Sequence, residues 1–286
     1  MTMKTNRSKV ALLGGDGRMR YAADSFAETG AEAAVFACPG ESGAEPGYTR
    51  AATPADALSG ADAVVLPIPT SRDGVTLNAP LTPDKLPLDD IISAIPESAV
   101  VYGGKFGKDF TEKLKERGVK YYDYAEDRYY AAINAAYTAE AAFALAVEST
   151  DKALRDCSCA IFGMGRIGKA LSGMLFGAGA RVTVFTRNPR DADFIEHMGM
   201  DCRFYSDCEK VLPECDILIN TVPEDSIADH FAAFPARCPI IDLAGVNSDL
   251  PNVTKALSLP SKYSPESAGR LICRAILRLM DGGERL

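Results

Sequence analysis

The chain is poor in histidine and lacks paired cysteines. Its 286 residues include two histidines, and its eight cysteines are scattered without a CxxC motif. Zinc sites need clustered ligands of these types, so we expect no metal. In a chain of this length without an export signal, the same scatter argues against a disulfide framework and for reduced thiols in the cytoplasm.

Long apolar runs and an excess of basic residues are also missing. No run approaches the roughly 20 apolar residues that span a bilayer, and the first short run, residues 10–13, ends at glycines. That run is typical of a buried strand rather than of a signal peptide. The formal net charge is −8. We therefore expect neither a membrane nor a nucleic acid as a partner.

The apolar residues occur in short runs that alternate with helical stretches. Hydrophobic residues make up 47% of the chain and charged residues 24%, as in globular proteins that bury a full core. Alternation of this kind predicts an α/β fold with two doubly wound parallel-sheet domains, the second a Rossmann-type dinucleotide-binding domain, joined by a long helix. The expected strands cover residues 10–13, 33–36, 63–66, 100–102, 159–162, 181–185, 217–220 and 240–243, and helices are expected over 18–29 and 167–176.

An alanine-rich stretch without proline or glycine, residues 129–150, predicts one long helix or two abutting ones. Ser264-Pro265-Glu266 marks the start of a last helix, which can pack back on the first domain. We expect a substrate-side α/β domain over 1–133, an interdomain helix over 134–156, a Rossmann NAD(P)-binding domain over 157–262 and a C-terminal helix over 263–286.

The clearest motif is Gly163-Met164-Gly165-Arg166-Ile167-Gly168, a GxGxxG pattern between an expected strand and an expected helix. In that context it predicts a dinucleotide site. Gly163 allows the tight turn, Gly165 lets the backbone approach the pyrophosphate, and Gly168 lets helix and strand pack closely. The amides of Arg166 and Ile167 face the phosphates at the helix start, and the Arg166 side chain can add a charge.

The end of the next strand indicates which nicotinamide cofactor is bound. Thr186-Arg187-Asn188 stands where an acidic residue would accept hydrogen bonds from a ribose 2′-hydroxyl. Donors and a fixed cation suit a 2′-phosphate, which favours NADP. The alternative is that Arg187 stacks on the adenine, which leaves NAD as the cofactor.

Two further strand ends are expected to line the ribose and nicotinamide. One carries Thr221, Val222 and Pro223, and the other carries Ala244. Ligands of open α/β sheets bind beyond the carboxyl ends of strands, where the strand order reverses.

The first domain offers polar groups for a small carboxylate. The glycine-rich turn at residues 14–18 contains Asp16, which binds substrate or caps its helix, and Arg18. Lys105 and Arg72 follow other strands. The further candidates, in the same domain and in the long helix that is expected to border an interdomain cleft, are Thr70, Ser71, Asn134, Thr138 and Glu140.

Seven segments in order resemble the A subunits of dipicolinate synthase from spore-forming bacteria: GGDGRM, LPIPTSRDGV, NAAYTAE, GMGRIG, DILINTVP, IIDLAG and SPESAG. The resemblance implies oxidation of a dihydrodipicolinate-type ring to pyridine-2,6-dicarboxylate, with a nicotinamide as hydride acceptor. It also implies a place in sporulation, in the mother-cell cytoplasm, and a partner in the form of a flavoprotein-like B subunit; self-association into a homo-oligomer stays open. The chain departs from the family in having Tyr137 and Ala141 where Pro-Thr-x-Glu-Gly is usual.

Glu140 is the first candidate for the catalytic proton acceptor, with a pKa that burial at the cleft would raise, and Lys105 is the second. Two other functions stay open. A non-catalytic NAD(P)-binding sensor or scaffold subunit needs no second polar cleft. An oxidoreductase like the D-2-hydroxy acid dehydrogenases needs a histidine poised by a carboxylate, and neither His197 nor His230 is placed for that role.

Overall fold

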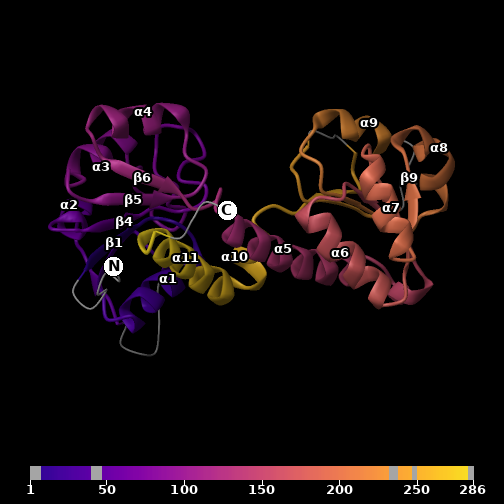
Figure 1. Ribbon diagram of the computed structural model, residues 1–286, viewed down its shortest axis with the longest axis horizontal. Helices are drawn as coiled ribbons and strands as arrows, with labels where there is room; N and C mark the ends of the chain where they lie inside the picture. Colours follow the sequence, from indigo (N-terminus) through magenta and orange to yellow (C-terminus); the bar gives the residue numbers. More distant parts are fainter. Residues whose placement is uncertain (1–7, 40–46, 232–237, 247–249, 283–286) are drawn as a thin grey trace. The chain divides into compact units, whose positions relative to one another are not determined.

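The structure is a computed structural model that describes residues 8–39, 47–231, 238–246 and 250–282 (Figure 1). The chain divides into two compact units. Unit 1 comprises Met1–Asn134 and Ser264–Leu286, and unit 2 comprises Ala135–Tyr263. Among the described residues, no helix is long and apolar enough to cross a membrane.

Unit 1 is built on a six-stranded sheet with the order β3-β2-β1-β4-β5-β6, in which every neighbouring pair is parallel. The strand order reverses between β1 and β4, so their carboxyl ends form a switch point. The strands are β1 (Lys9–Leu13), β2 (Glu32–Phe36), β3 (Thr49–Arg50), β4 (Ala63–Val65), β5 (Val100–Gly103) and β6 (Lys120–Asp123). The helices are α1 (Gly17–Glu28), α2 (Pro54–Leu58), α3 (Leu88–Ala94), α4 (Lys108–Glu116) and α11 (Pro265–Met280).

Helices cover both faces of the unit 1 sheet. Buried apolar side chains of α2, α3 and α4 pack on one face, and α1 and α11 lie on the other (Figure 1). The approach of α11 to α1 depends on Gly269. A Cβ atom there would lie 2.3 Å from the carbonyl oxygen of Arg18 and 2.6 Å from the Cβ of Tyr21. Only glycine therefore lets these helices meet at this distance.

Unit 2 repeats the same sheet architecture with the order β12-β11-β10-β7-β8-β9, again parallel throughout. Its switch point lies between β7 and β10. The strands are β7 (Ser158–Phe162), β8 (Arg181–Phe185), β9 (Asp201–Arg203), β10 (Ile217–Asn220), β11 (Ile240–Asp242) and β12 (Val253–Lys255). The helices are α6 (Arg166–Gly177), α7 (Pro189–His197), α8 (Cys208–Val211), α9 (Ala228–Phe231) and α10 (Leu259–Tyr263), and single 3₁₀ turns lie at Leu154–Asp156, Tyr205–Asp207, Leu212–Glu214 and Asp225–Ile227.

Alternate residues of the central strands of unit 2 belong to two separate cores. In β7, Cys159 and Ile161 pack with side chains of α6 and α7, whereas Ala160 and Phe162 pack with side chains of α8 and α9. Successive side chains of a strand point to opposite faces. Both faces of the sheet are therefore buried, which explains why its strands are continuous apolar runs.

The predicted α/β class with two parallel sheets and a Rossmann-type second domain is confirmed. All eight predicted strands are present, while β3, β6, β9 and β12 were not predicted. These four are the edges of the two sheets. They are short and mostly partly or fully exposed, so they lack the apolar run that marks a buried strand.

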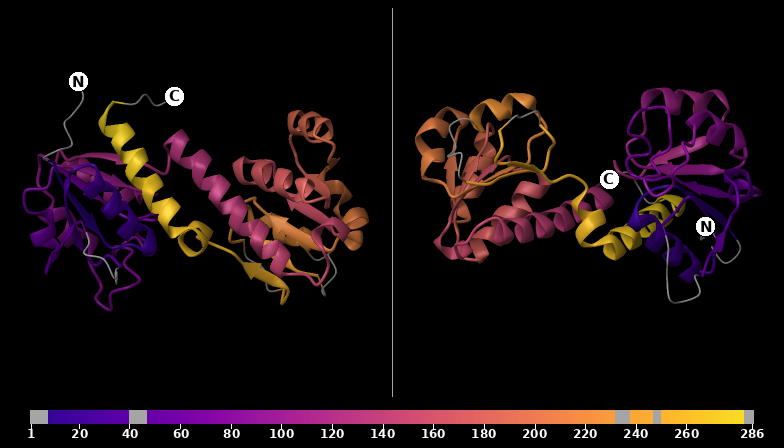
Figure 2. Two further views of the ribbon diagram at one scale, coloured as in Figure 1. Left: turned by 90° about the horizontal axis from the view of Figure 1, so that it is seen from below. Right: turned by 180° about the vertical axis from the view of Figure 1, so that it is seen from behind.

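The alanine-rich stretch forms one continuous helix, α5 (Arg128–Glu148), rather than two (Figure 2). The boundary between the units falls inside it, after Asn134. The last helix begins after Ser264 with Pro265 in its first turn, but the Ser264 side chain makes no capping hydrogen bond.

Candidate functional site

The glycine turn of unit 2 joins β7 to α6 and rests against the loop that follows β10. Gly163 has a φ of +94°, and a Cβ atom there would lie 2.7 Å from both Thr221 Oγ1 and Val222 Cγ2. A Cβ at Gly168 would lie 2.1 Å from the Gly163 carbonyl oxygen. The first and third glycines are thus required by close contacts inside the protein.

The second glycine has a different environment. Gly165 is exposed at the N-cap of α6, where no side chain caps the helix, and no heavy atom lies within 4 Å of a Cβ built there. The space beside it is open, next to the first amides of α6. Free amides and the positive end of the helix dipole bind phosphate groups, so this turn fits the pyrophosphate of a dinucleotide. Arg166 is exposed at the same helix end.

At the end of β8, the three predicted cofactor contacts have different environments. Thr186 is buried, and its Oγ1 accepts a hydrogen bond from the Asn188 amide at 3.1 Å. Asn188 caps α7 by accepting from the Arg190 amide at 3.1 Å. Arg187 is exposed and forms a two-pronged ion pair with Glu224, with Nη1 donating to Oε2 at 2.9 Å. Of the three, only Arg187 extends a charged group outward.

The loops after β10 and β11 are held together by a buried polar pair, Asn220 and Asp242, both fully buried. Asp242 Oδ1 accepts from Asn220 Nδ2 at 2.9 Å and from the Ala244 amide at 3.1 Å. Asn220 Oδ1 accepts from the Val222 amide at 3.0 Å. Thr221 Oγ1 donates to the Phe162 carbonyl at 2.8 Å. The predicted contacts Thr221, Val222 and Ala244 are therefore fixed next to the glycine turn, and Pro223 is exposed beside them.

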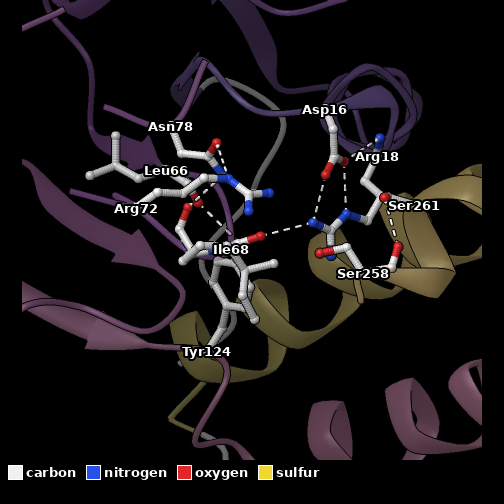
Figure 3. A network of polar contacts seen from close by, with 10 residues as sticks. Asp16, Arg18, Leu66, Ile68, Arg72, Asn78, Tyr124, Ser258 and Ser261 are labelled. Carbon is white, nitrogen blue, oxygen red and sulfur yellow. Dashed lines mark hydrogen bonds and ion pairs between the residues drawn. The ribbon is translucent and has the colours of Figure 1, made fainter. Parts of the chain in front are cut away.

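In unit 1, the glycine-rich turn at the switch point is occupied by an internal ion pair (Figure 3). Asp16 caps α1 by accepting from the Arg18 amide at 3.2 Å. Its carboxylate also accepts from Arg18 Nε at 2.8 Å and from Nη2 at 2.7 Å, and the same Nη2 donates to the Ile68 carbonyl at 2.8 Å. Arg18 is 6% exposed. Arg18 was predicted to bind a substrate carboxylate, but its Nε and Nη2 already donate to Asp16 and to the Ile68 carbonyl.

The Asp16–Arg18 pair also shifts the Asp16 pKa. Burial alone would raise the pKa of this carboxyl, but the hydrogen bonds and charge of Arg18 outweigh burial and hold the pKa below its ordinary value. The charge of Arg72 lowers the pKa of Asp16 further. Asp16 is thus an ionised cap and anchor at neutral pH.

The loop after β4 divides its polar residues between two clefts. Thr70 and Ser71 line a cleft of about 210 Å³ with Lys108. The buried Thr70 hydroxyl donates to the carbonyls of Pro67 and Gly104. The Ser71 hydroxyl donates to the Asp73 carboxylate in an exposed turn.

Arg72 lines a different cleft, of about 320 Å³. It is exposed, and its Nε donates to Asn78 Oδ1 at 3.2 Å. Asn78 is buried, and its own side-chain amide donates to the Pro69 carbonyl at 2.9 Å, while its backbone carbonyl accepts from Gly15 at 2.8 Å. Asn78 thereby ties Arg72 to the loops of both switch-point strands.

The two candidates for the proton acceptor belong to different units. Lys105 follows β5 in unit 1 with a φ of +55°, and its backbone amide donates to Asp123 Oδ1 at 3.1 Å. Its side chain is exposed. Glu140 lies on α5 in unit 2 and is exposed as well. Glu140 is thus not packed inside unit 2, and its burial at an interdomain cleft stays a prediction. Asn134 is half-buried and Thr138 is buried on the same helix.

Neither histidine has the partner that a hydroxy acid dehydrogenase requires. His197 is exposed in the last turn of α7, and His230 stacks on Phe162 with ring centroids 6.0 Å apart. Neither forms an ion pair with a carboxylate among the described residues. Among all residues that the structure describes, no group of three or more His, Cys, Asp or Glu side chains could hold a metal ion.

Comparisons with known proteins match the two units separately. Residues 9–125 match the family model for the N-terminal domain of the dipicolinate synthase A subunit. Residues 128–233 match the model of the NAD binding domain of D-isomer specific 2-hydroxyacid dehydrogenases. The chain is thus similar to dipicolinate synthase A subunits over unit 1 and carries an NAD-binding domain in unit 2. Its NAD-binding domain makes it an NAD(P)-dependent oxidoreductase with a nicotinamide dinucleotide cofactor.

Solved structures share the fold over nearly the whole chain. The dipicolinate synthase A subunit from Bacillus halodurans is 23% identical, with a TM-score of 0.85 over 97% of this chain and 99% of that one. The corresponding protein from Bacillus subtilis is 20% identical, with a TM-score of 0.81 over 96% of each chain. A transhydrogenase from Sinorhizobium meliloti is 15% identical, with a TM-score of 0.67 over 96% of this chain and 92% of that one. Among curated proteins, the comparison gave no match.

The sequence did not reveal the roles of three residues. Asp242 and Asn78 are buried polar residues that hold loops in place, and a single sequence does not show which loops a side chain will contact. Glu224 was missed because its partner Arg187 lies 37 residues away. Its position one residue after Pro223, in a loop already expected to line the cofactor, was the available signal.

Proposed function

We propose that this chain catalyses the NADP-dependent dehydrogenation of a dihydrodipicolinate-type cyclic dicarboxylate to dipicolinate, as the A subunit of a dipicolinate synthase. The observation that carries the proposal is the match of unit 1, residues 9–125, to the N-terminal domain of that protein. The open amide cradle at Gly165 in unit 2 supports the cofactor part of the proposal.

In unit 2, the chain binds and orients the dinucleotide. The amides of α6 would hold the pyrophosphate beside Gly165, and the guanidinium of Arg187 would bind the 2′-phosphate. The further proposed cofactor contacts lie at the same end of the sheet, after β7 and β8: Arg166, Ile167, Thr186 and Asn188. The bound nicotinamide supplies the hydride acceptor for the reaction.

In unit 1, the chain recognises a carboxylate of the substrate through Arg72. This exposed cation is held by Asn78 at the end of β4, and it keeps guanidinium hydrogens available because Asn78 accepts only from Nε among the described contacts. A planar guanidinium binds a carboxylate with two parallel hydrogen bonds. Asp16 and Arg18 support this loop from inside, through the Ile68 carbonyl. Asn134 and Thr138 are further proposed contacts of the substrate, whereas Thr70 and Ser71 would contact it only if it occupied the second cleft.

Aromatisation removes a hydride from one ring carbon and a proton from the ring. The carboxylate of Glu140 takes that proton and, being exposed, passes it to water. Lys105 is the alternative acceptor. Positioning of the ring against the cofactor supplies most of the remaining rate enhancement.

Turnover of a cyclic imino-dicarboxylate with NADP tests the whole proposal. Glu140→Gln should lower kcat by roughly 100-fold or more with an unchanged dissociation constant for NADP. Glu148→Gln, an exposed acid on the same helix, is the matched control and should turn over like wild type. Normal turnover of Glu140→Gln would remove this residue from the mechanism. Cofactor binding without turnover under any substrate would favour the sensor.

The two clefts of unit 1 can be distinguished by their cations. Arg72→Gln should raise KM for the diacid by roughly tenfold or more, the value of one charge-assisted hydrogen bond. Lys108→Gln, in the cleft of Thr70 and Ser71, should leave KM unchanged. The reverse result would move the substrate site to that second cleft.

Arg187→Gln tests the choice of cofactor and should weaken NADP far more than NAD. Arg190→Gln, an exposed arginine in the first turn of α7, controls for net charge. Equal losses for both cofactors would contradict a 2′-phosphate contact.

We also propose that the chain works with a flavoprotein-like B subunit in the mother-cell cytoplasm during sporulation. The likeness to structures of A subunits supports a second subunit. Co-expression with a B subunit of the same organism, followed by size-exclusion chromatography, tests the complex; separate elution of the two chains would contradict it.

A further inference from the structure

The cation proposed to bind the 2′-phosphate already has an anionic partner in this structure. Arg187 follows β8, and Glu224 follows β10. Both guanidinium Nη atoms donate to the Glu224 carboxylate, Nη1 to Oε2 at 2.9 Å and Nη2 to Oε1. The hydrogen bonds and charge of Glu224 raise the pKa of Arg187 above its ordinary value. The two guanidinium nitrogens that a phosphate would use are therefore already bound to the Glu224 carboxylate.

The Arg187–Glu224 pair lies beside the glycine turn. Glu224 is two residues from Val222, whose Cγ2 would touch a Cβ at Gly163. On the other side, the Arg187 guanidinium lies over the Tyr205 ring, 5.7 Å from its centroid. Tyr205 meets Phe162, the residue before Gly163, edge to face at 5.4 Å. The pair is thus anchored through two neighbours to the turn that fits the dinucleotide.

We propose that Glu224 determines how strongly this protein discriminates between NADP and NAD, an inference that rests on the proposed function. The Glu224 carboxylate competes with the 2′-phosphate for Arg187. Glu224 also accepts a hydrogen bond from the 2′-hydroxyl of NAD. In this protein the acidic residue for that contact therefore comes from the loop after β10 and not from the end of β8.

Charge decides the direction of this effect. A 2′-phosphate must displace Glu224 from Arg187 and then remain near the carboxylate, which repels it. NAD has no charge at that position and leaves the pair intact. Both side chains are more than 40% exposed, so the pair is weak enough for a phosphate to displace it. Glu224 thereby reduces the preference for NADP that Arg187 creates.

Glu224→Gln removes the competing charge and keeps the shape of the side chain. We expect the dissociation constant for NADP, measured by calorimetry at fixed ionic strength, to fall by about tenfold, the value of one charge-assisted contact. The constant for NAD should stay the same or rise, so the ratio of the two changes by tenfold or more. Glu209→Gln, an exposed acid on α8, makes the same change in net charge and should leave the ratio unaltered.

Pairing this variant with Arg187→Gln separates the two proposals. In the double variant, the gain from Glu224→Gln should be clearly smaller, because the phosphate no longer has a cation to compete for and only the direct repulsion is removed. If Arg187→Gln selectively weakens NADP while Glu224→Gln leaves the ratio unchanged, the inference about Glu224 is overturned and the phosphate contact stands. If neither single variant alters the ratio, the proposed phosphate contact fails too.

Discussion

Replacing Gly165 with alanine should abolish most of the cofactor affinity while leaving the fold intact. Gly165 has an extended backbone, with φ −71° and ψ −168°, that any residue adopts, and no heavy atom lies within 4 Å of the added Cβ. Alanine at this N-cap should therefore cost about 1 kcal/mol or less of the free energy of unfolding. The methyl group would stand where the pyrophosphate must approach the amides of α6.

The expected loss of affinity follows from the hydrogen bonds at stake. One hydrogen bond to a charged group is worth about 1.5–3 kcal/mol, which corresponds to roughly a 10- to 150-fold rise in the dissociation constant. Calorimetric titration with NADP and with NAD measures this rise, and thermal unfolding followed by circular dichroism measures stability.

Gly173→Ala provides the matched control. It makes the same chemical change in the exposed interior of the same helix, where a Cβ also meets nothing within 4 Å. It should stabilise the protein by about 1 kcal/mol, because glycine disfavours helix interiors, and leave both dissociation constants unchanged. If Gly165→Ala bound both cofactors as tightly as wild type, the cradle at α6 would not be the phosphate site.

Three further predictions concern stability. Because the Asp16 pKa is lower in the folded state, its contribution to stability is complete above about pH 4 and declines as the pH falls through the folded pKa. Asp16→Asn should therefore flatten the loss of urea-unfolding stability below about pH 4, and identical profiles would refute this. Asp242→Ala should cost about 1–3 kcal/mol, because the buried Asn220 amide group and the part-buried Ala244 amide each lose a hydrogen bond. Asp242→Asn keeps the acceptor and should cost far less, and equal losses in chemical denaturation would contradict the pairing. Gly269→Ala should lower the melting temperature, because its Cβ would lie 2.3 Å from the Arg18 carbonyl oxygen and overpacking costs about 1–3 kcal/mol; an unchanged melting temperature would show that α11 can shift without loss.

The local chemistry of the site could be predicted where it depends on neighbours in the sequence. The GxGxxG turn was recognised because its glycines serve contacts within six residues and one adjoining loop. The Asp16 cap was one of two interpretations of its turn, and the structure has it, since an N-cap acts on amides two residues ahead.

Long-range partners and burial could not be predicted in the same way. Arg18 was predicted to bind a substrate carboxylate, but Ile68, fifty residues away, completes its hydrogen bonds. Glu140 lies on a helix with alanine on every side, which leaves no apolar stripe to indicate which face packs inward.

The amino-acid sequence by itself determined the central strands, the long helix and the position of the dinucleotide turn, because apolar periodicity and glycine spacing act over a few residues. Only the tertiary structure decided which partner holds each of the three arginines. Asp16 holds Arg18, Asn78 holds Arg72, and Glu224 holds Arg187. The last of these pairs arises because the parallel order β10-β7-β8 brings distant strand ends to one edge of the sheet, where a loop can meet a cation far away in the sequence.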